Sequence, residues 1–354
     1  MSNLSDAREN NFNILHLVAA SAVIFSHATD ITKNEKDIFA QLIGYSIGWV
    51  AVSAFFSISG MLIYQSVVRS QSVWDYVVAR SLRIFPGPWV RLLISVGILG
   101  FLISTIPPGS FFRNPEVSQY IIGNAILYVP QYLLPGLFET NPMPAVNGSL
   151  WTLRFEFTCY IITLLLFLVS AYRTEKQFVA MCLIVLVGYF GFLGLGVMTG
   201  TLDTVLYDGS DFAKLHRLFF AFFLGIVMGR YVHCFRPKGW MVFASMALCV
   251  VFFSTPLFLT ALVTTTSVTL FYLAFLQHPW LVSFRSMPDY SYGIYIYAFP
   301  VQQFVEDLMP EMGWLENALL SLLITLPFAA LSWHLIEKPA LSLKGHLNPK
   351  RAAQ

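Results

Sequence analysis

The 354-residue sequence has little charge: Asp, Glu, Lys and Arg make up 11% of it, whereas soluble globular domains average about 25%. Hydrophobic residues make up 56%, and the mean hydropathy is +0.66. So small a charged fraction with so large an apolar one excludes an ordinary soluble domain. The composition therefore predicts an integral membrane protein.

Cysteine is also scarce, and the four cysteines show no CxxC motif or metal-ligand spacing. This pattern argues against a disulfide framework and against a zinc site, and we expect no metal cofactor. The residues lie in or beside apolar runs, where cysteine usually serves as a small packing residue. They are Cys159, Cys182, Cys234 and Cys249.

Long apolar runs are abundant. A hydrocarbon core about 30 Å thick takes roughly 20 helical residues to cross. A further stretch, 118–138, contains Pro130 and Pro135, so we expect a re-entrant or surface helix there and no eleventh span. Ten runs predict membrane-spanning helices: 12–29, 42–68, 86–107, 150–170, 177–199, 212–233, 239–256, 258–277, 290–307 and 315–337.

Lysine and arginine set the orientation of the spans, because cytoplasmic loops carry an excess of both. With the N-terminus inside, 15 of the 21 Lys and Arg residues fall in cytoplasmic segments or near the cytoplasmic ends of the spans. We therefore predict an all-α polytopic membrane protein with ten spans and both termini cytoplasmic. It would form one membrane-embedded domain over 1–354, with cytoplasmic tails at 1–11 and 338–354 and an outer loop at 107–149.

Two histidines lie in the first apolar run, and ionisable groups inside a span mark candidate functional sites. His16 and His27 are eleven residues apart, so they lie within about 20° of each other on one helix face and about 16 Å apart along it. A single histidine in a span often only joins helices by a hydrogen bond. The shared face, with Asp30 one turn beyond His27, favours a catalytic tunnel in which His27 moves a proton and a carboxylate fixes its tautomer.

Glu156 lies in the fourth run, shortly after Asn147-Gly148-Ser149-Leu150-Trp151. If that helix enters the membrane from outside near residue 149, Glu156 lies at about the depth of His27. Two interpretations stay open. Glu156 neutralises Arg154, or its carboxylate orients His27 or binds an acceptor hydroxyl.

Arg80 and Arg83 are three residues apart, which places both guanidinium groups on one helix face. Such a pair suits two oxygens of a diphosphate, although two arginines at a membrane boundary usually serve as positive-inside anchors. In the second run, Ser59 and Gly60 are small enough to let helices pack closely. They would equally leave room for a slender acyl-pantetheine arm.

These features together resemble the acyltransferase 3 family of polytopic membrane proteins, which O-acylate cell-surface carbohydrates with cytoplasmic acyl-CoA. The resemblance covers nearly the whole chain in the family's order, and it implies ten membrane helices. His16 stands where the family usually has arginine, and Ala298 where it often has histidine. The stretches that carry the resemblance are Asn10–His27, Phe55–Leu62, Arg80–Arg83 with Ile84 and Pro86, Asn147–Leu153 with Glu156, Ser291–Tyr297 with Pro300, and Glu337–Pro339.

The resemblance implies a bacterial inner-membrane enzyme that moves an acyl group, most simply acetyl, from acyl-CoA to a hydroxyl of a lipopolysaccharide, exopolysaccharide or related glycan. His27 would act as the general base or briefly carry the acyl group itself. We assign His27, Asp30 and Glu156 to catalysis, Arg80, Arg83, Ser59 and Gly60 to acyl-CoA binding, and His16, Ser149 and Trp151 to substrate binding.

As partners we expect acyl-CoA, a carbohydrate acceptor and membrane lipid, and no nucleic acid. Two alternatives from other classes stay open. Ten spans with buried His, Glu and Arg also suit a proton-coupled secondary transporter, although the sequence shows no repeated halves of the kind common in transporters. A membrane scaffold or sensor with a degenerate site is the other, and His16 in place of arginine is its main support.

Overall fold

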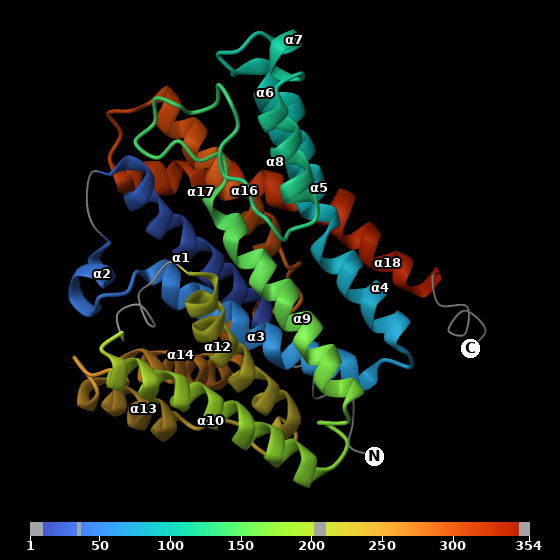
Figure 1. Cartoon of the computed structure of the whole chain (residues 1–354), viewed down its shortest axis with the longest axis vertical. Helices are drawn as coiled ribbons and strands as arrows, with labels where there is room; N and C mark the ends of the chain where they lie inside the picture. The colour runs from blue at the N-terminus through green and yellow to red at the C-terminus, as the bar shows by residue number, and fades with distance from the viewer. Residues whose placement is uncertain (1–9, 34–36, 202–209, 347–354) are drawn as a thin grey trace. The chain divides into compact units, whose positions relative to one another are not determined.

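The computed structural model describes residues 10–33, 37–201 and 210–346, and over these residues the chain forms helices and no strand (Figure 1). The all-α prediction is therefore confirmed. The chain divides into two compact units, and that they form one membrane-embedded domain stays a prediction. The first unit comprises Met1–Phe12, Val52–Val73 and Thr158–Arg285, and the second comprises Asn13–Ala51, Trp74–Phe157 and Ser286–Gln354.

The first unit is held together by close helix packing. A Cβ on Gly60 would collide with the carbonyl oxygen of Phe222, and one on Gly225 with that of Ser57. The backbones of α3 (Ile47–Arg69) and α12 (Asp211–Tyr231) therefore touch at these glycines. The helices of this unit are α10 (Glu175–Thr199), α12 (Asp211–Tyr231), α13 (Gly239–Val251), α14 (Phe258–Phe275) and α15 (Pro279–Ser283), with most of α3 (Ile47–Arg69) and the later part of α9 (Trp151–Leu168).

The second unit contains the first and last long helices of the chain. Two short π-helical stretches, η2 and η4, interrupt its α-helices, and such stretches often mark functional sites. Its elements are α1 (Phe12–Thr32), α2 (Ile38–Ile43), α4 (Val73–Ile84), α5 (Pro86–Leu93), η2 (Ile94–Leu99), α6 (Gly100–Leu102), α7 (Pro108–Phe111), α8 (Pro115–Ala125), η3 (Gly148–Leu150), the start of α9, α16 (Ser291–Leu308), α17 (Trp314–Ser332), η4 (Trp333–Glu337) and α18 (Lys338–His346).

Eight helical segments of the described chain are long and apolar enough to cross a membrane. Each of the ten predicted runs contains a helix, but α13 has only 13 residues. α16 is not among the eight segments, and it carries Gln302, Gln303 and Glu306. The chain is thus a multi-pass membrane protein, while the count of ten spans stays a prediction. The eight segments are Phe12–Thr32, Ile47–Arg69, Val73–Leu102, Gly148–Leu168, Glu175–Thr199, Asp211–Tyr231, Phe258–Phe275 and Trp314–Lys344.

The third segment begins earlier than its apolar run at 86–107 predicts. It starts at Val73, because Pro86 and Pro88 fall in the first turn of α5, where proline costs no helical hydrogen bond. The prolines therefore bend the segment at Phe85 without ending it. As a result Arg80 and Arg83 lie inside a candidate span, and not before it.

The interrupted stretch 118–138 forms no span. Its helix, α8, has 11 residues, about half of what a crossing needs. In its last turn the Asn124 side chain accepts a hydrogen bond from the Gln131 backbone and donates one back, which folds the chain at Pro130. The following residues bury Leu134 and Leu137 against Tyr120 of α8. The chain between α8 and η3 is therefore a packed loop.

The first prediction concerns this loop. If 107–149 lies wholly outside, single cysteines at Phe112 and Thr140 should both react with an impermeant maleimide added to intact cells. Both positions are exposed, whereas Asn141 is buried. The background should carry Cys234→Ser, because Cys234 is the exposed native thiol. Labelling of only one position from outside would show that the stretch between them crosses the membrane.

Candidate functional site

Both histidines of α1 face the same neighbouring segment of the second unit. His16 Nδ1 lies 3.9 Å from Asp289 Oδ2, just before α16, and the His27 ring packs edge-on against Phe299 of α16 with 5.1 Å between ring centroids. Between them, Gln302 donates a hydrogen bond from Nε2 to the backbone carbonyl of Ile24. The shared face predicted by the eleven-residue spacing is therefore observed.

His27 meets the start of the fourth candidate span. Its Nε2 lies 3.4 Å from Ser149 Oγ, and either atom can donate, depending on the tautomer. Asn147 fixes Ser149, because its Oδ1 accepts from the Ser149 backbone N–H while its Nδ2 donates to the Ile296 carbonyl. One amide thus caps η3 and ties it to α16. Gly148 is required here, since a Cβ would collide with the Phe299 ring.

A second layer of hydroxyls supports this contact. Tyr295 donates from its hydroxyl to the Ser149 carbonyl at 3.0 Å and also shares a short hydrogen bond with Thr152 Oγ1. All three residues are buried. The Asn-Gly-Ser-Leu-Trp-Thr motif therefore places a serine hydroxyl in front of His27 and locks the backbone behind it.

The two predicted carboxylate partners of His27 lie elsewhere. Asp30 is exposed and forms no hydrogen bond with His27 in the described chain. Glu156 lies near Tyr292 and Tyr295, with which it interacts electrostatically, and it does not bond to His27 either. The polar contact that His27 makes is with Ser149. That Asp30 or Glu156 orients His27 during catalysis stays a prediction.

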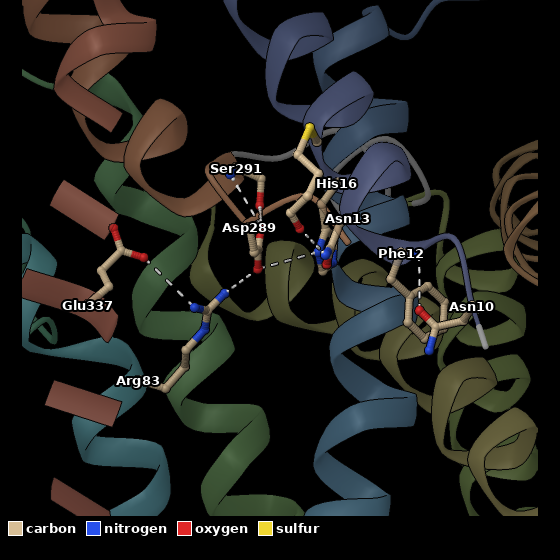
Figure 2. A network of polar contacts seen from close by, with 9 residues as sticks. Asn10, Phe12, Asn13, His16, Arg83, Asp289, Ser291 and Glu337 are labelled. Atoms are coloured by element: carbon tan, nitrogen blue, oxygen red, sulfur yellow. Dashed lines mark hydrogen bonds and ion pairs between the residues drawn. The ribbon is translucent and has the colours of Figure 1, made fainter. Parts of the chain in front are cut away.

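Arg83 is held between two carboxylates. Its Nη2 donates to Asp289 Oδ2 at 2.8 Å, and its Nη1 lies 3.8 Å from Glu337 Oε2 (Figure 2). The guanidinium also lies over the Tyr292 ring, 5.3 Å from its centroid. Asp289 is itself shared, because the oxygen that binds Arg83 is also the one nearest His16.

Helix ends and irregular turns position these groups. Asp289 accepts hydrogen bonds from the backbone and hydroxyl of Ser291, which starts α16. Glu337 ends the π-helical turn η4 and accepts a hydrogen bond from Ser332 Oγ at 2.9 Å. The Glu337 side chain is 3% exposed, so its carboxyl group faces the interior of the unit.

The charge of Asp289 is favoured by its surroundings. Burial raises the pKa of its carboxyl, but the Arg83 guanidinium, His16 and the Ser291 hydroxyl outweigh burial and hold this pKa below its usual range. Asp289 is therefore a carboxylate at neutral pH. It gives Arg83 a permanent counter-charge.

The other residues predicted to bind the acyl-CoA donor lie in different surroundings. Arg80 lies one turn before Arg83 on α4, and its Nε is buried without a hydrogen-bond partner in the described chain. Gly60 belongs to the first unit, where its missing side chain serves helix packing. That acyl-pantetheine passes Ser59 and Gly60 stays a prediction. Trp151 begins α9 and packs edge-on against Phe155.

Sequence reasoning did not single out Asp289, and it gave Glu337 no role. Arg83 and Asp289 are 206 residues apart in the chain, so no local spacing joins them. A signal was nonetheless present: Asp289 and Glu337 are acids at the edges of apolar runs, and a buried arginine requires such partners. In the described residues, no three His, Cys, Asp or Glu side chains gather as metal ligands.

Known proteins match most of the length of this chain. The sequence model of the acyltransferase domain family matches residues 9–336. The chain is 30% identical over 343 residues to the O-acetyl transferase of Shigella phage Sf6, covering 95% of this chain and 97% of that protein. It is also 30% identical over 375 residues to nodulation protein 10 of Rhizobium leguminosarum bv. viciae, covering 98% and 97%. No solved structure matches.

The second prediction concerns Asp289. Asp289→Asn removes a charge-assisted hydrogen bond to Arg83 and should lower the free energy of unfolding by about 1.5–3 kcal/mol. The deficit should shrink at acid pH, because the wild-type carboxylate loses its charge as the pH falls through its lowered pKa. Unfolding of the purified protein in detergent measures both effects.

Glu175→Gln is the matched control, since the Glu175 side chain is 59% exposed in its ion pair with Arg230 and exposed pairs contribute little. An unchanged melting temperature for Asp289→Asn at neutral pH would show that Arg83 does not depend on Asp289.

Proposed function

Because this chain belongs to the acyltransferase domain family, we propose that it transfers an acetyl group from cytoplasmic acetyl-CoA to a hydroxyl of a cell-surface or lipid-linked glycan. The chain is an acyltransferase and a multi-pass membrane protein; the donor, its side and the acceptor are what we propose. The relative named O-acetyl transferase supports oxygen as the receiving atom. We place the enzyme in the bacterial inner membrane.

The observation that carries this proposal is the distance between the arginine cluster and the candidate base, measured along α1. His16 of α1 faces Asp289, the carboxylate that Arg83 binds, and His27 lies eleven residues after His16 on α1. Eleven helical residues span about 16 Å. An acyl-CoA has its phosphates and its thioester at opposite ends of a long, thin arm, so arginines that bind the phosphates and a base that activates the acceptor hydroxyl beside the thioester need such a separation.

On the donor side, Arg80 and Arg83 bind phosphate oxygens. Both are on α4, and their i,i+3 spacing gives them a common face. The two arginines contribute unequally, because Arg83 is already paired with Asp289 and Glu337. A phosphate competes with these carboxylates for Arg83, whereas no described carboxylate is paired with Arg80.

On the acceptor side, His27 is the general base. In the neutral tautomer protonated at Nδ1, its Nε2 accepts the proton of the acceptor hydroxyl as that oxygen attacks the thioester carbonyl. The carbon–sulfur bond then breaks, and the CoA thiolate takes up a proton. Ser149 Oγ, 3.4 Å from Nε2, marks the place that a hydroxyl occupies in front of the base.

The third prediction tests the base. His27→Ala should lower the rate of acetyl transfer by at least ~10²-fold, the usual contribution of a general base, with little change in the KM for acetyl-CoA. Transfer is measured in proteoliposomes with radiolabelled acetyl-CoA and membrane glycan as acceptor. His233→Ala is the matched control, because His233 is exposed and follows α12 in the first unit.

A His27→Ala protein that turns over at the wild-type rate would remove His27 from the mechanism. Wild-type protein that transfers no acyl group to any glycan, while glycans from cells with and without the gene have equal masses, would overturn the proposed function itself.

The fourth prediction tests the donor site. Arg80→Ala should raise the KM for acetyl-CoA by about 10- to 150-fold, equivalent to losing a charge-assisted bond of about 1.5–3 kcal/mol. Arg83→Ala should have the smaller effect on KM, because the positive charge of Arg83 is already offset by Asp289 and Glu337. Lysine at position 80 should restore binding only in part, since it lacks the planar fork.

Arg69→Ala serves as the control, because Arg69 is an exposed arginine at the end of α3 that bonds to Gln65. If Arg80→Ala and Arg83→Ala both keep the wild-type KM, these arginines only anchor the segment in the membrane.

A further inference from the structure

Arg91 is a buried cation that the proposed mechanism does not use. It lies on α5, eighteen residues into the Val73–Leu102 segment, and is 1% exposed. Its Nη1 donates to the hydroxyl of Tyr120 at 2.9 Å. Its Nε and Nη2 have no hydrogen-bond partner within the described residues.

The charge of Arg91 is not balanced by a direct contact. No carboxylate in the described part of the chain forms an ion pair with it, whereas Arg83 has two within 4 Å. Arginine stays protonated even when buried. Buried charges in proteins are normally paired, so Arg91 calls for an anion.

The unpaired atoms form one binding edge. Nε–H and the neighbouring Nη2–H point the same way within the guanidinium plane, and this pair of parallel donors matches two oxygens of an oxyanion. Tyr120 holds the opposite nitrogen, Nη1, and Tyr120 is itself fully buried. The phenol thus fixes the guanidinium, and the two donors of the other edge are left without a hydrogen-bond partner among the described residues.

The surroundings connect Arg91 to the Arg83 cluster. Arg91 interacts electrostatically with Tyr297, whose hydroxyl is hydrogen-bonded to Ser332, and Ser332 donates to Glu337. α5 packs against α8, α16 and η4, which carry Tyr120, Tyr297 and Glu337. Arg91 is eleven residues from the far end of its segment at Leu102, or about 16 Å along the helix. It therefore lies deep in the candidate span.

We propose that Arg91 binds a phosphoryl oxyanion of one of the two substrates through Nε and Nη2. This inference rests on the proposed function, because that reaction brings phosphoryl groups to the enzyme from two sources: the phosphates of the CoA donor and the diphosphate of a lipid-linked glycan. Either group presents adjacent acceptor oxygens that fit the free edge.

Binding of two soluble probes to the purified full-length protein tests the proposal. Coenzyme A stands for the donor and farnesyl diphosphate for the lipid-linked acceptor. We expect at least one probe to raise the melting temperature of the wild type. Arg91→Met should weaken the affinity for that probe at least tenfold, and the probe that responds identifies the source. The exposed Arg113→Met is the matched control and should bind like the wild type.

The melting temperature without probe separates binding from folding. Replacing a buried charge that lacks a counter-charge by an apolar side chain of similar length should leave this temperature unchanged or raise it. If Arg91→Met does not fold, Arg91→Lys carries the test, because it keeps the charge and loses the two-pronged edge. It should bind the responding probe at least fivefold more weakly than the wild type.

Equal affinities of wild type and both variants for both probes would overturn the inference, as would a wild type that neither probe stabilises. Acetyl transfer measured on the same preparations keeps the two proposals apart. If the wild type is active but probe binding does not depend on position 91, the anion site is wrong and the proposed function stands. If the wild type is inactive but probe binding depends on Arg91, the proposed function is wrong and the anion site stands.

Discussion

The charge on Arg83 is the constraint on which the described site depends. A guanidinium stays protonated even in an apolar interior, so its charge has to be balanced by acidic side chains of the same chain. It does so from two distant places, Asp289 ahead of α16 and Glu337 at the end of η4. These ion pairs bring the end of α4, the start of α16 and the end of η4 together. His16 joins through the same Asp289 oxygen, which aligns α1 with α16 and thereby positions His27.

The sequence predicted the parts of this arrangement that have a local cause. Apolar length predicted the helices, and a spacing of eleven residues put His16 and His27 on one face. Local rules failed at the third span, because Pro86 was taken as a start and in fact occupies the first turn of a continuing helix. They also failed for Asp289, whose partner is 206 residues away. Such pairs are set by how helices pack, and no periodicity within one helix reveals that packing.

The His27 site shows the same division. Its motif contains a glycine, a serine and a threonine, whose small side chains suggest close packing, and the structure explains each one. Gly148 clears the Phe299 ring, Ser149 faces Nε2, and Thr152 bonds to Tyr295. A carboxylate beside His27 was predicted from Asp30, one turn further along the helix, and from the estimated depth of Glu156, but neither position shows which side chain the ring nitrogen faces. In the described chain the position beside His27 Nε2 belongs to a hydroxyl.

The three arginines of one segment, Arg80, Arg83 and Arg91, therefore differ in the charge they offer. Two carboxylates face Arg83, so that cluster has spare positive charge only when His16 is protonated and Glu337 is neutral at the same time. No described carboxylate pairs with Arg80 or Arg91. Because Coulomb attraction for a phosphate depends on the net local charge, Arg83 acts mainly as the organising centre of the second unit. Arg80 and Arg91 then provide most of the attraction for substrate phosphates. They lie at two depths, because Arg91 is eleven residues, or about 16 Å, further along the segment than Arg80.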